Sequence, residues 1–86
     1  MKAMIVTKIG GPEVLCLEDR PAPISTDTKV LVRVCAAGIN RADILMRQGR
    51  YGVSSQAPTE PLGLEIAGII EQIGENVSRW KVGDRV

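Results

Sequence analysis

Hydrophobic residues occur along this chain in short runs that glycine and proline interrupt. Residues 2–8 and 14–19 are apolar and β-branched runs on either side of a Gly-Gly-Pro sequence at 10–12, which predicts two strands joined by a turn. Prolines at 21 and 23 end the second strand, because proline cannot donate a ladder hydrogen bond. The first quarter of the chain is therefore expected to form a β-hairpin.

Residues 30–37 give the clearest strand pattern. Val30, Val32, Val34 and Ala36 alternate with a second set of residues that includes Arg33, so one face of this strand is entirely apolar. A charged residue on the other face indicates that this side is only partly covered, as in an antiparallel sheet or at the rim of a barrel.

A short helix over 41–48 is expected directly after this strand. Gly38 breaks the strand, and Asn40 is a good N-cap. Its backbone N–H can donate a hydrogen bond to the carboxylate of Asp43 at the third helical position. Asp43 and Arg47 have the spacing of an exposed ion pair, and Gly49 is well placed as the residue that ends the helix.

The second half of the chain alternates loops with strands. Residues 50–61 lack periodicity and predict a long surface loop, and residues 64–73 predict a strand in which Gly68 marks a bulge or the close approach of another backbone. Trp80 is expected to anchor a polar corner over 77–84. A strand beginning at 84–86 would leave an open edge, so we expect one incomplete domain and association with another chain.

Composition excludes several functional classes. The 86 residues are 44% hydrophobic and 24% charged, and the net charge of +1 gives no electrostatic basis for binding nucleic acid. The longest apolar stretch is too short to cross a membrane. With no Phe, one Tyr and one Trp, the core must be aliphatic, and Cys16 and Cys35 are expected to be buried free thiols of a cytoplasmic protein.

Two kinds of chemistry are missing from the sequence. The chain contains no histidine, which removes histidine-based nucleophile pairs, imidazole bases and most metal sites, and its two cysteines are far apart. No glycine-rich phosphate loop follows any strand, so a dinucleotide would have to be held mainly elsewhere.

The candidate site lies in residues 38–51, with residues 61–65 as its partner across a cleft. Asn40 is either a helix cap alone or also an amide that orients a ligand, and Asp43 is either a helix-dipole residue or a functional carboxylate. Tyr51 either covers the core or donates its phenol to a substrate carbonyl. Glu65 is expected to be exposed or paired.

Several motifs together resemble the N-terminal, GroES-like catalytic domain of the medium-chain dehydrogenase/reductase superfamily. They are Gly-Pro-Glu-Val-Leu at 11–15, Val-Leu-Val-Arg-Val at 30–34, Ala-Gly-Ile-Asn-Arg-Ala-Asp at 37–43, Gly-Leu-Glu-Ile-Ala-Gly at 63–68 and Lys-Val-Gly-Asp-Arg-Val at 81–86. The resemblance implies a mainly β fold with one short helix, a partly open GroES-like β-barrel that is incomplete over 1–86, and no Rossmann domain within this chain.

The resemblance also implies a function. Zinc alcohol dehydrogenases carry Cys where this chain has Asn40 and His where it has Leu64, whereas the zinc-free NADPH:quinone oxidoreductase branch is similar over 40–51. That branch implies NADPH, a quinone or an α,β-unsaturated carbonyl as acceptor, and no metal. Asn40 and Asp43 would then lie at the cofactor and Tyr51 would face the acceptor, with Asn40 and Tyr51 as the catalytic residues.

Two other interpretations remain open at this level. A GroES-like fold can be a non-enzymatic binding module, and a truncated product can regulate a full-length partner through open strand edges. Homo-oligomer formation or edge-strand association is expected under each. Whether the reductant is NADPH or NADH stays open, and the isolated chain is expected to be catalytically inactive because it lacks a pyrophosphate site.

Overall fold

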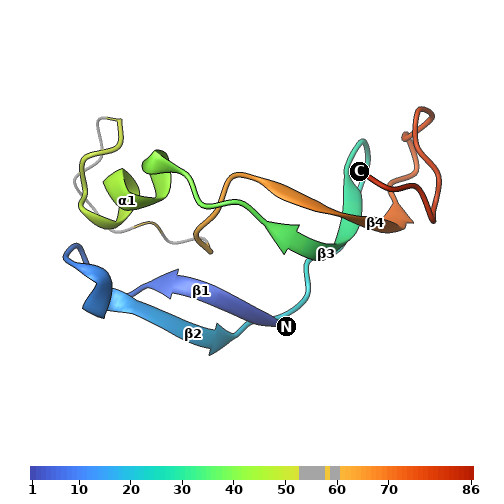
Figure 1. Cartoon of the computed structure of the whole chain (residues 1–86). Helices are drawn as coiled ribbons and strands as arrows, with labels where there is room; N and C mark the ends of the chain where they lie inside the picture. The colour runs from blue at the N-terminus through green and yellow to red at the C-terminus, as the bar shows by residue number, and fades with distance from the viewer. Residues whose placement is uncertain (53–57, 59–60) are drawn as a thin grey trace. The chain divides into compact units, whose positions relative to one another are not determined.

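The computed structural model describes residues 1–52, 58 and 61–86. The elements run in the order β1 (Lys2–Val6), a 3-10 turn (Pro12–Val14), β2 (Leu15–Asp19), β3 (Val30–Ala37), α1 (Arg41–Arg47) and β4 (Ile66–Ile73), as Figure 1 shows. The described chain is thus mainly β with one short α-helix, as predicted. Its named strands form two two-stranded sheets and no closed barrel.

The chain divides into two compact units. Unit 1 combines Met1–Pro21 with Gly38–Leu64, and unit 2 combines Ala22–Ala37 with Glu65–Val86. Unit 1 holds the β1–β2 hairpin and α1, and unit 2 holds the β3–β4 sheet. All three sequence-predicted site residues, Asn40, Asp43 and Tyr51, therefore belong to unit 1.

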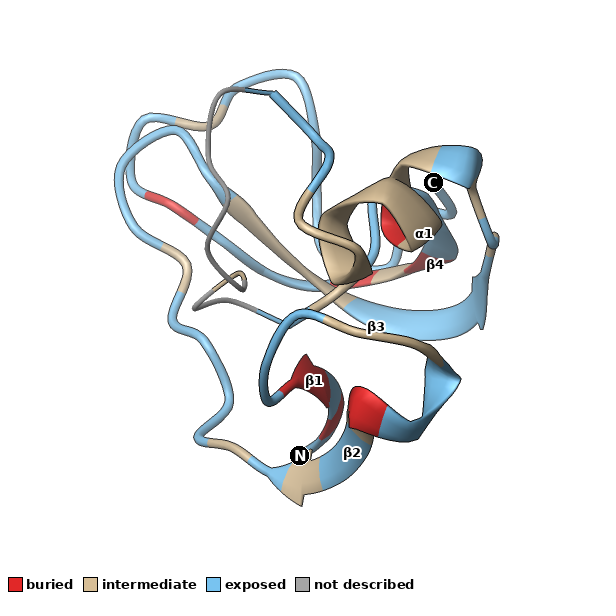
Figure 2. Cartoon of the chain, turned by 90° about the vertical axis from the view of Figure 1, so that its left-hand side faces the viewer, coloured by how far each residue is buried: buried red, intermediate tan, exposed pale blue. Residues whose placement is uncertain are grey.

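Unit 1 begins with the predicted hairpin. β1 and β2 are antiparallel, from Lys2 opposite Asp19 to Val6 opposite Leu15. Buried side chains gather on β1 and just before β2, where Figure 2 shows red segments, and they are small or aliphatic: Ala3, Ile5, Val6 and Val14. The expectation of an aliphatic core is confirmed, because the sequence has no Phe and its single Tyr and single Trp are both exposed.

Backbone hydrogen bonds connect the hairpin of unit 1 to α1 and to the segment that follows the helix. The N–H of Gly10 donates to the carbonyl of Arg47 in the last turn of the helix at 3.0 Å, and the N–H of Leu62 donates to the carbonyl of Met4 at 2.9 Å. Helix carbonyls at a C-terminus have no partner within the helix, so the first of these bonds satisfies one of them.

Unit 2 is built on β3 and β4, which pair antiparallel from Val30 opposite Ile73 to Ala37 opposite Ile66. The register shifts twice, between Leu31 and Val32 and between Val34 and Ala36. Each bulge adds a residue to one strand and interrupts the two-residue period. The strict alternation of faces predicted for β3 is therefore wrong. The bulges arise from the pairing of β3 with β4, which the period of the sequence alone does not reveal.

Gly68 lies at the second bulge, as its position in the strand predicted. A Cβ atom at this residue would collide with the backbone carbonyl oxygen of Arg33 on β3. On its other side, Gly68 exchanges backbone hydrogen bonds with Val86 of 2.8 and 3.0 Å. Only glycine allows β3 and the end of the chain to approach this closely.

The predicted strand at 84–86 pairs with β4 within unit 2. Ile69 bridges Arg85 in antiparallel fashion, and Ile70 donates to the carbonyl of Asp84 at 2.9 Å. Ile70 is only 1% exposed, which makes it the most buried large side chain among the described residues. The last residues of the chain thus have one edge paired with β4, and the association of their other edge with another chain stays a prediction.

A second group of contacts closes unit 2 at the other end of its sheet. The backbone N–H of Gly74 donates to the carbonyl of Lys29. Asn76 makes two hydrogen bonds to Asp27: its backbone N–H donates to the carbonyl, and its side-chain amide donates to the carboxylate at 2.6 Å. Asp27 has a φ of 51°, a left-handed conformation that aspartate tolerates better than most residues. Residues 74–76 thus form a turn that is held to the segment before β3.

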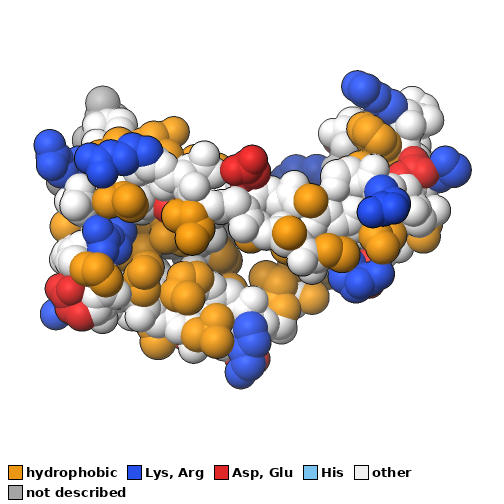
Figure 3. Space-filling view, viewed as in Figure 1, with side chains coloured by type: hydrophobic (Ala, Val, Ile, Leu, Met, Phe, Trp, Pro, Cys, Tyr) orange, Lys and Arg blue, Asp and Glu red, His pale blue; other side chains and the backbone are white. Residues whose placement is uncertain are grey.

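The expected burial of the two cysteines is wrong. Cys16 and Cys35 are free thiols but both are exposed, since a two-stranded sheet leaves much of each face uncovered. Trp80 is 38% exposed, and the guanidinium of Arg79 lies over its ring, 5.1 Å from the centroid. Figure 3 likewise shows hydrophobic side chains at the surface of both units. No helix of the described residues has the length and apolarity to span a membrane.

Candidate functional site

The N-terminus of α1 holds the first two candidate residues. Asn40 is the N-cap, with extended backbone angles of φ −117° and ψ 153°, and it forms a capping box with Asp43. The carboxylate of Asp43 accepts a hydrogen bond of 2.8 Å from the backbone N–H of Asn40. The cap and the return bond predicted for these two residues are confirmed.

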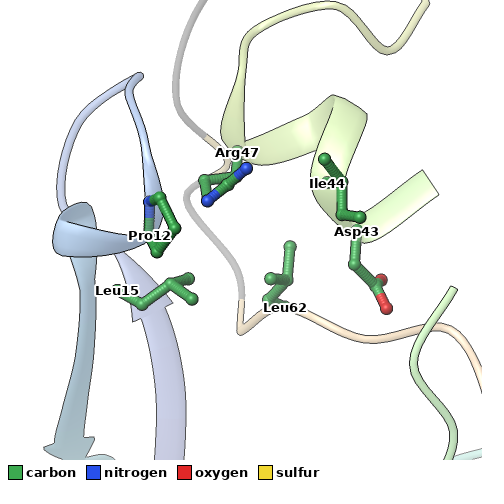
Figure 4. Close-up of a pocket in the computed structure, with 6 residues that line it drawn as sticks. All are labelled: Pro12, Leu15, Asp43, Ile44, Arg47 and Leu62. Carbon is green, nitrogen blue, oxygen red and sulfur yellow. The ribbon is translucent and has the colours of Figure 1, made fainter. Parts of the chain in front are cut away.

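Asp43 is buried, at 7% exposure, although it is charged. The predicted exposed ion pair with Arg47 does not form: none of the ion pairs between described residues joins these two side chains. Figure 4 shows why, since the Asp43 carboxylate points away from the Arg47 side chain. The carboxylate turns back to the start of the helix, where the helix dipole favours a negative charge.

A pocket of about 270 Å³ lies within unit 1 beside this helix. Three parts of the unit supply its lining, as Figure 4 shows: Pro12 and Leu15 from the hairpin, Asp43, Ile44 and Arg47 from α1, and Leu62 from the segment after it. The surface of the pocket is almost wholly apolar, because the polar atoms of Asp43 and Arg47 contribute little to it. Such a pocket suits an apolar group.

Tyr51 follows the other end of α1. Gly49 ends the helix with a φ of +69°, and the N–H groups of Gly49 and Arg50 bond back to Met46 and Leu45, which is a Schellman motif. The predicted helix end at Gly49 is confirmed. Tyr51 is 47% exposed and does not line the pocket.

Asn40 and Tyr51 lie beyond opposite ends of α1 in the sequence. Asn40 precedes α1, and Tyr51 comes shortly after its last residue, Arg47. At 1.5 Å per residue, the caps of this helix are about 12 Å apart.

The segment 61–65 is only partly joined to this site. Leu62 lines the pocket with Asp43, but Leu64 is 56% exposed, and Glu65 is exposed in unit 2. The expectation that Glu65 would be exposed or paired is confirmed. The predicted long loop at 50–61 falls mostly outside the described residues, and its form stays a prediction.

Sequence reasoning assigned a site role to only one of the six residues that line the pocket, Asp43. Pro12 and Leu15 were read as turn and strand residues, and Arg47 and Leu62 had no assigned site role. No local signal marks these positions, because three segments far apart in the sequence form the pocket. The hydrogen bond from Gly10 to Arg47 is the contact that brings the hairpin to the helix.

Among the described residues, neither a metal site nor a pyrophosphate site is formed. No group of three His, Cys, Asp or Glu side chains in the described part of the chain is arranged to hold a metal ion. A pyrophosphate needs clustered N–H donors, and the N-terminus of α1 does not fit one, because the buried Asp43 carboxylate already lies there. The side-chain amide of Asn40 carries both a hydrogen-bond donor and an acceptor at the start of this helix.

Comparison with known proteins places the chain in a family. The model of the alcohol dehydrogenase GroES-like domain matches residues 26–86. The whole chain is 46% identical to the quinone oxidoreductase of Sus scrofa and 44% identical to that of Homo sapiens, and it covers 26% of each of them. The chain thus spans about a quarter of the length of the curated relatives it matches.

Solved structures agree with this similarity. The quinone oxidoreductase of Escherichia coli, in complex with NADPH, superimposes on 99% of this chain with a TM-score of 0.84 and 34% identity, and the chain covers 26% of it. The Pseudomonas syringae quinone oxidoreductase gives 0.83 and 41% over 98% of the chain, which covers 25% of that structure. The chain belongs to the family of alcohol dehydrogenase GroES-like domains, in the medium-chain dehydrogenase/reductase superfamily.

Proposed function

We propose that this chain is the acceptor-side part of a zinc-independent, NADPH-dependent reductase of quinones or α,β-unsaturated carbonyls. The observation that carries the proposal is the similarity of the whole chain to quinone oxidoreductases, at up to 46% identity. The chemistry of two positions supports the zinc-free branch. Asn40 and Leu64 stand where zinc-dependent relatives carry ligands, and neither an amide nor an aliphatic side chain is a usual zinc ligand.

In this proposal NADPH supplies the hydride, and the residues of the chain orient the reactants. Asn40 holds the nicotinamide end through its side-chain amide. Tyr51 is half exposed, so its phenol is available to donate a hydrogen bond to the acceptor carbonyl oxygen, where negative charge develops as the hydride arrives. In this proposal Asn40, before α1, contacts the cofactor, and Tyr51, after α1, contacts the acceptor.

The same proposal makes the isolated chain inactive. The described residues offer no fit for the pyrophosphate, so the cofactor has to be bound mainly by polypeptide outside these 86 residues. Hydride transfer requires the nicotinamide and the acceptor to be held within about 3.5 Å of each other. The purified chain is therefore expected to oxidise no NADPH in the presence of a quinone.

A chimera tests the activity. This chain would replace the matching residues of the Escherichia coli quinone oxidoreductase, and NADPH consumption would be followed with a benzoquinone and with an enone. We expect turnover, and a reduction in kcat of about tenfold or more in Tyr51→Phe, which keeps the ring and removes the donor. Phe is a matched control for packing, because only the hydroxyl differs.

Inactivity of a folded chimera that still binds NADPH would overturn the enzymatic proposal and favour the GroES-like binding module. The choice of NADPH over NADH is carried over from the similar quinone oxidoreductases, because the described residues do not set it. Edge-strand association of the chain is part of the proposal as well, and light scattering across a concentration series tests it. The cytoplasmic location expected from the free thiols stays a prediction.

A further inference from the structure

Asp43 stands out because its burial conflicts with its charge. Its side chain is 7% exposed, and it is the buried charged residue among those the structure describes. Removing a carboxylate from water is costly unless hydrogen bonds compensate for the lost solvation. The structure shows where the compensation comes from: one carboxylate oxygen, Oδ2, accepts the backbone N–H of Asn40 at 2.8 Å.

The bond is one half of a reciprocal arrangement. Asn40 and Asp43 form a capping box, and the N–H of Asp43 also donates to the carbonyl of Asn40 at 3.0 Å. These contacts hold the backbone of Asn40 in its extended conformation at the point where the chain turns into α1. Fixing this backbone fixes the direction of the Asn40 Cα–Cβ bond, and in the capping box the Asn40 side chain accepts the backbone N–H of Asp43.

The second carboxylate oxygen of Asp43 is not presented to a ligand. Oδ1 of Asp43 is buried without a hydrogen-bond partner, and the pocket beside it has almost no polar surface. Neither oxygen is therefore presented to a ligand in that pocket. A direct contact between Asp43 and a cofactor would require the buried Oδ1 to become exposed or Oδ2 to leave the N–H of Asn40.

We propose that Asp43 is a positioning residue that acts through Asn40: its carboxylate fixes the Asn40 backbone and so aims the amide that meets the nicotinamide. This inference rests on the proposed function for its catalytic meaning. Its structural content, the control of the Asn40 conformation by Asp43, holds independently of the reaction and is tested separately.

The structural test uses NMR on the 86-residue chain. Asp43→Ala removes the acceptor, Asp43→Leu removes it while keeping the side-chain volume in apolar surroundings, and Asp43→Asn keeps an acceptor oxygen. We expect the exchange protection of the Asn40 N–H to fall about fivefold or more in the Ala and Leu variants, and the Asn40 χ1 couplings to average over rotamers. The Asn variant is expected to preserve both signals.

Asn76 is the internal control, since it is the same residue type in unit 2 and donates its N–H to Asp27 at 3.0 Å. Its protection should not change in any variant. If Asp43→Ala does not fold, Asp43→Leu decides the question. Unchanged Asn40 signals in a folded variant that lacks the acceptor would overturn the proposal.

The catalytic test is a double-mutant cycle in the active chimera. Asn40→Ala and Asp43→Leu are each expected to lower kcat/KM for NADPH by about tenfold, and the double variant should lie within about twofold of Asn40→Ala alone. Multiplied losses would mean that Asp43 acts independently of Asn40 and would overturn the positioning role. An inactive wild-type chimera would refute the proposed function, and the NMR result would still decide whether Asp43 controls Asn40.

Discussion

Ile9 lies directly against Gly49, the residue that ends α1. A Cβ atom at Gly49 would collide with Cδ1 of Ile9 and would lie 3.1 and 3.2 Å from its Cγ1 and Cγ2. Next to this contact, Gly10 donates its N–H to the carbonyl of Arg47. The turn of the hairpin and the end of the helix are thus joined at a position where a larger residue would not fit.

Gly49→Ala is expected to destabilise unit 1. A left-handed conformation costs a non-glycine residue about 1 kcal/mol, and displacing Ile9 adds to this cost. Gly52→Ala is the matched control, because Gly52 has φ +70° and no described residue other than its chain neighbours lies within 4 Å of its Cβ position. Urea unfolding should show the larger loss for Gly49→Ala, and adding Ile9→Ala should abolish the difference between the two glycine variants. Equal losses in the two single variants would contradict this account.

Gly68→Ala is expected to disrupt unit 2. The new methyl group would meet the backbone carbonyl of Arg33, which cannot move without breaking the β3–β4 ladder. Overpacking of this kind costs about 3 kcal/mol or more, a large part of the stability of a small domain. Amide exchange in β3 and β4 should accelerate. The neighbouring Ala67→Gly is the control, since Ala67 is exposed and its loss should cost no more than about 1 kcal/mol.

Asn40 should separate helix capping from ligand binding. Asn40→Ala is expected to lower the free energy of unfolding by about 1 kcal/mol, whereas Asn40→Asp keeps a capping oxygen and should stay within about 0.5 kcal/mol of the wild type. In the chimera, both variants are expected to lose activity, because neither retains the amide. Wild-type turnover by Asn40→Asp would reduce Asn40 to a structural role.

Because of Asp84, the free energy of unfolding of the chain is expected to depend on pH in the acidic range. A hydrogen bond of 2.6 Å from the Lys81 side chain, assisted by one from the Lys81 backbone, lowers the pKa of Asp84 below its usual 3.8. Because the folded-state pKa is the lower one, the stabilisation is present above pH 3.8 and is lost as the pH falls through the folded value.

The measurement is an NMR titration of the Asp84 carboxyl carbon. Lys81→Met removes the side-chain donor and keeps the backbone N–H, so the pKa should rise towards 3.8 without reaching it. The acid limb of thermal stability should become shallower in the same variant. An unchanged pKa would show that the Lys81 side chain does not hold this carboxylate.

The sequence alone determined the elements with local causes. Pro12 and its neighbouring glycines placed the hairpin turn, Asn40 and Gly49 placed the two ends of α1, and an interior Gly68 marked the close approach of β3 to β4. Each follows from backbone conformations that only certain residue types accept. The motifs at 37–43 and 63–68 likewise indicated the family that comparison with known proteins established.

Only the tertiary structure decided which side chains are buried and which segments meet. Asp43 was expected to be exposed and paired with Arg47 and is instead buried against the N–H of Asn40, whereas the cysteines were expected to be buried and are exposed. Burial depends on contacts between residues distant in the sequence, such as Leu62 beside Asp43, and on the number of strands that cover a face. Neither can be read from a local pattern, because a short-range period describes one element and not what packs against it.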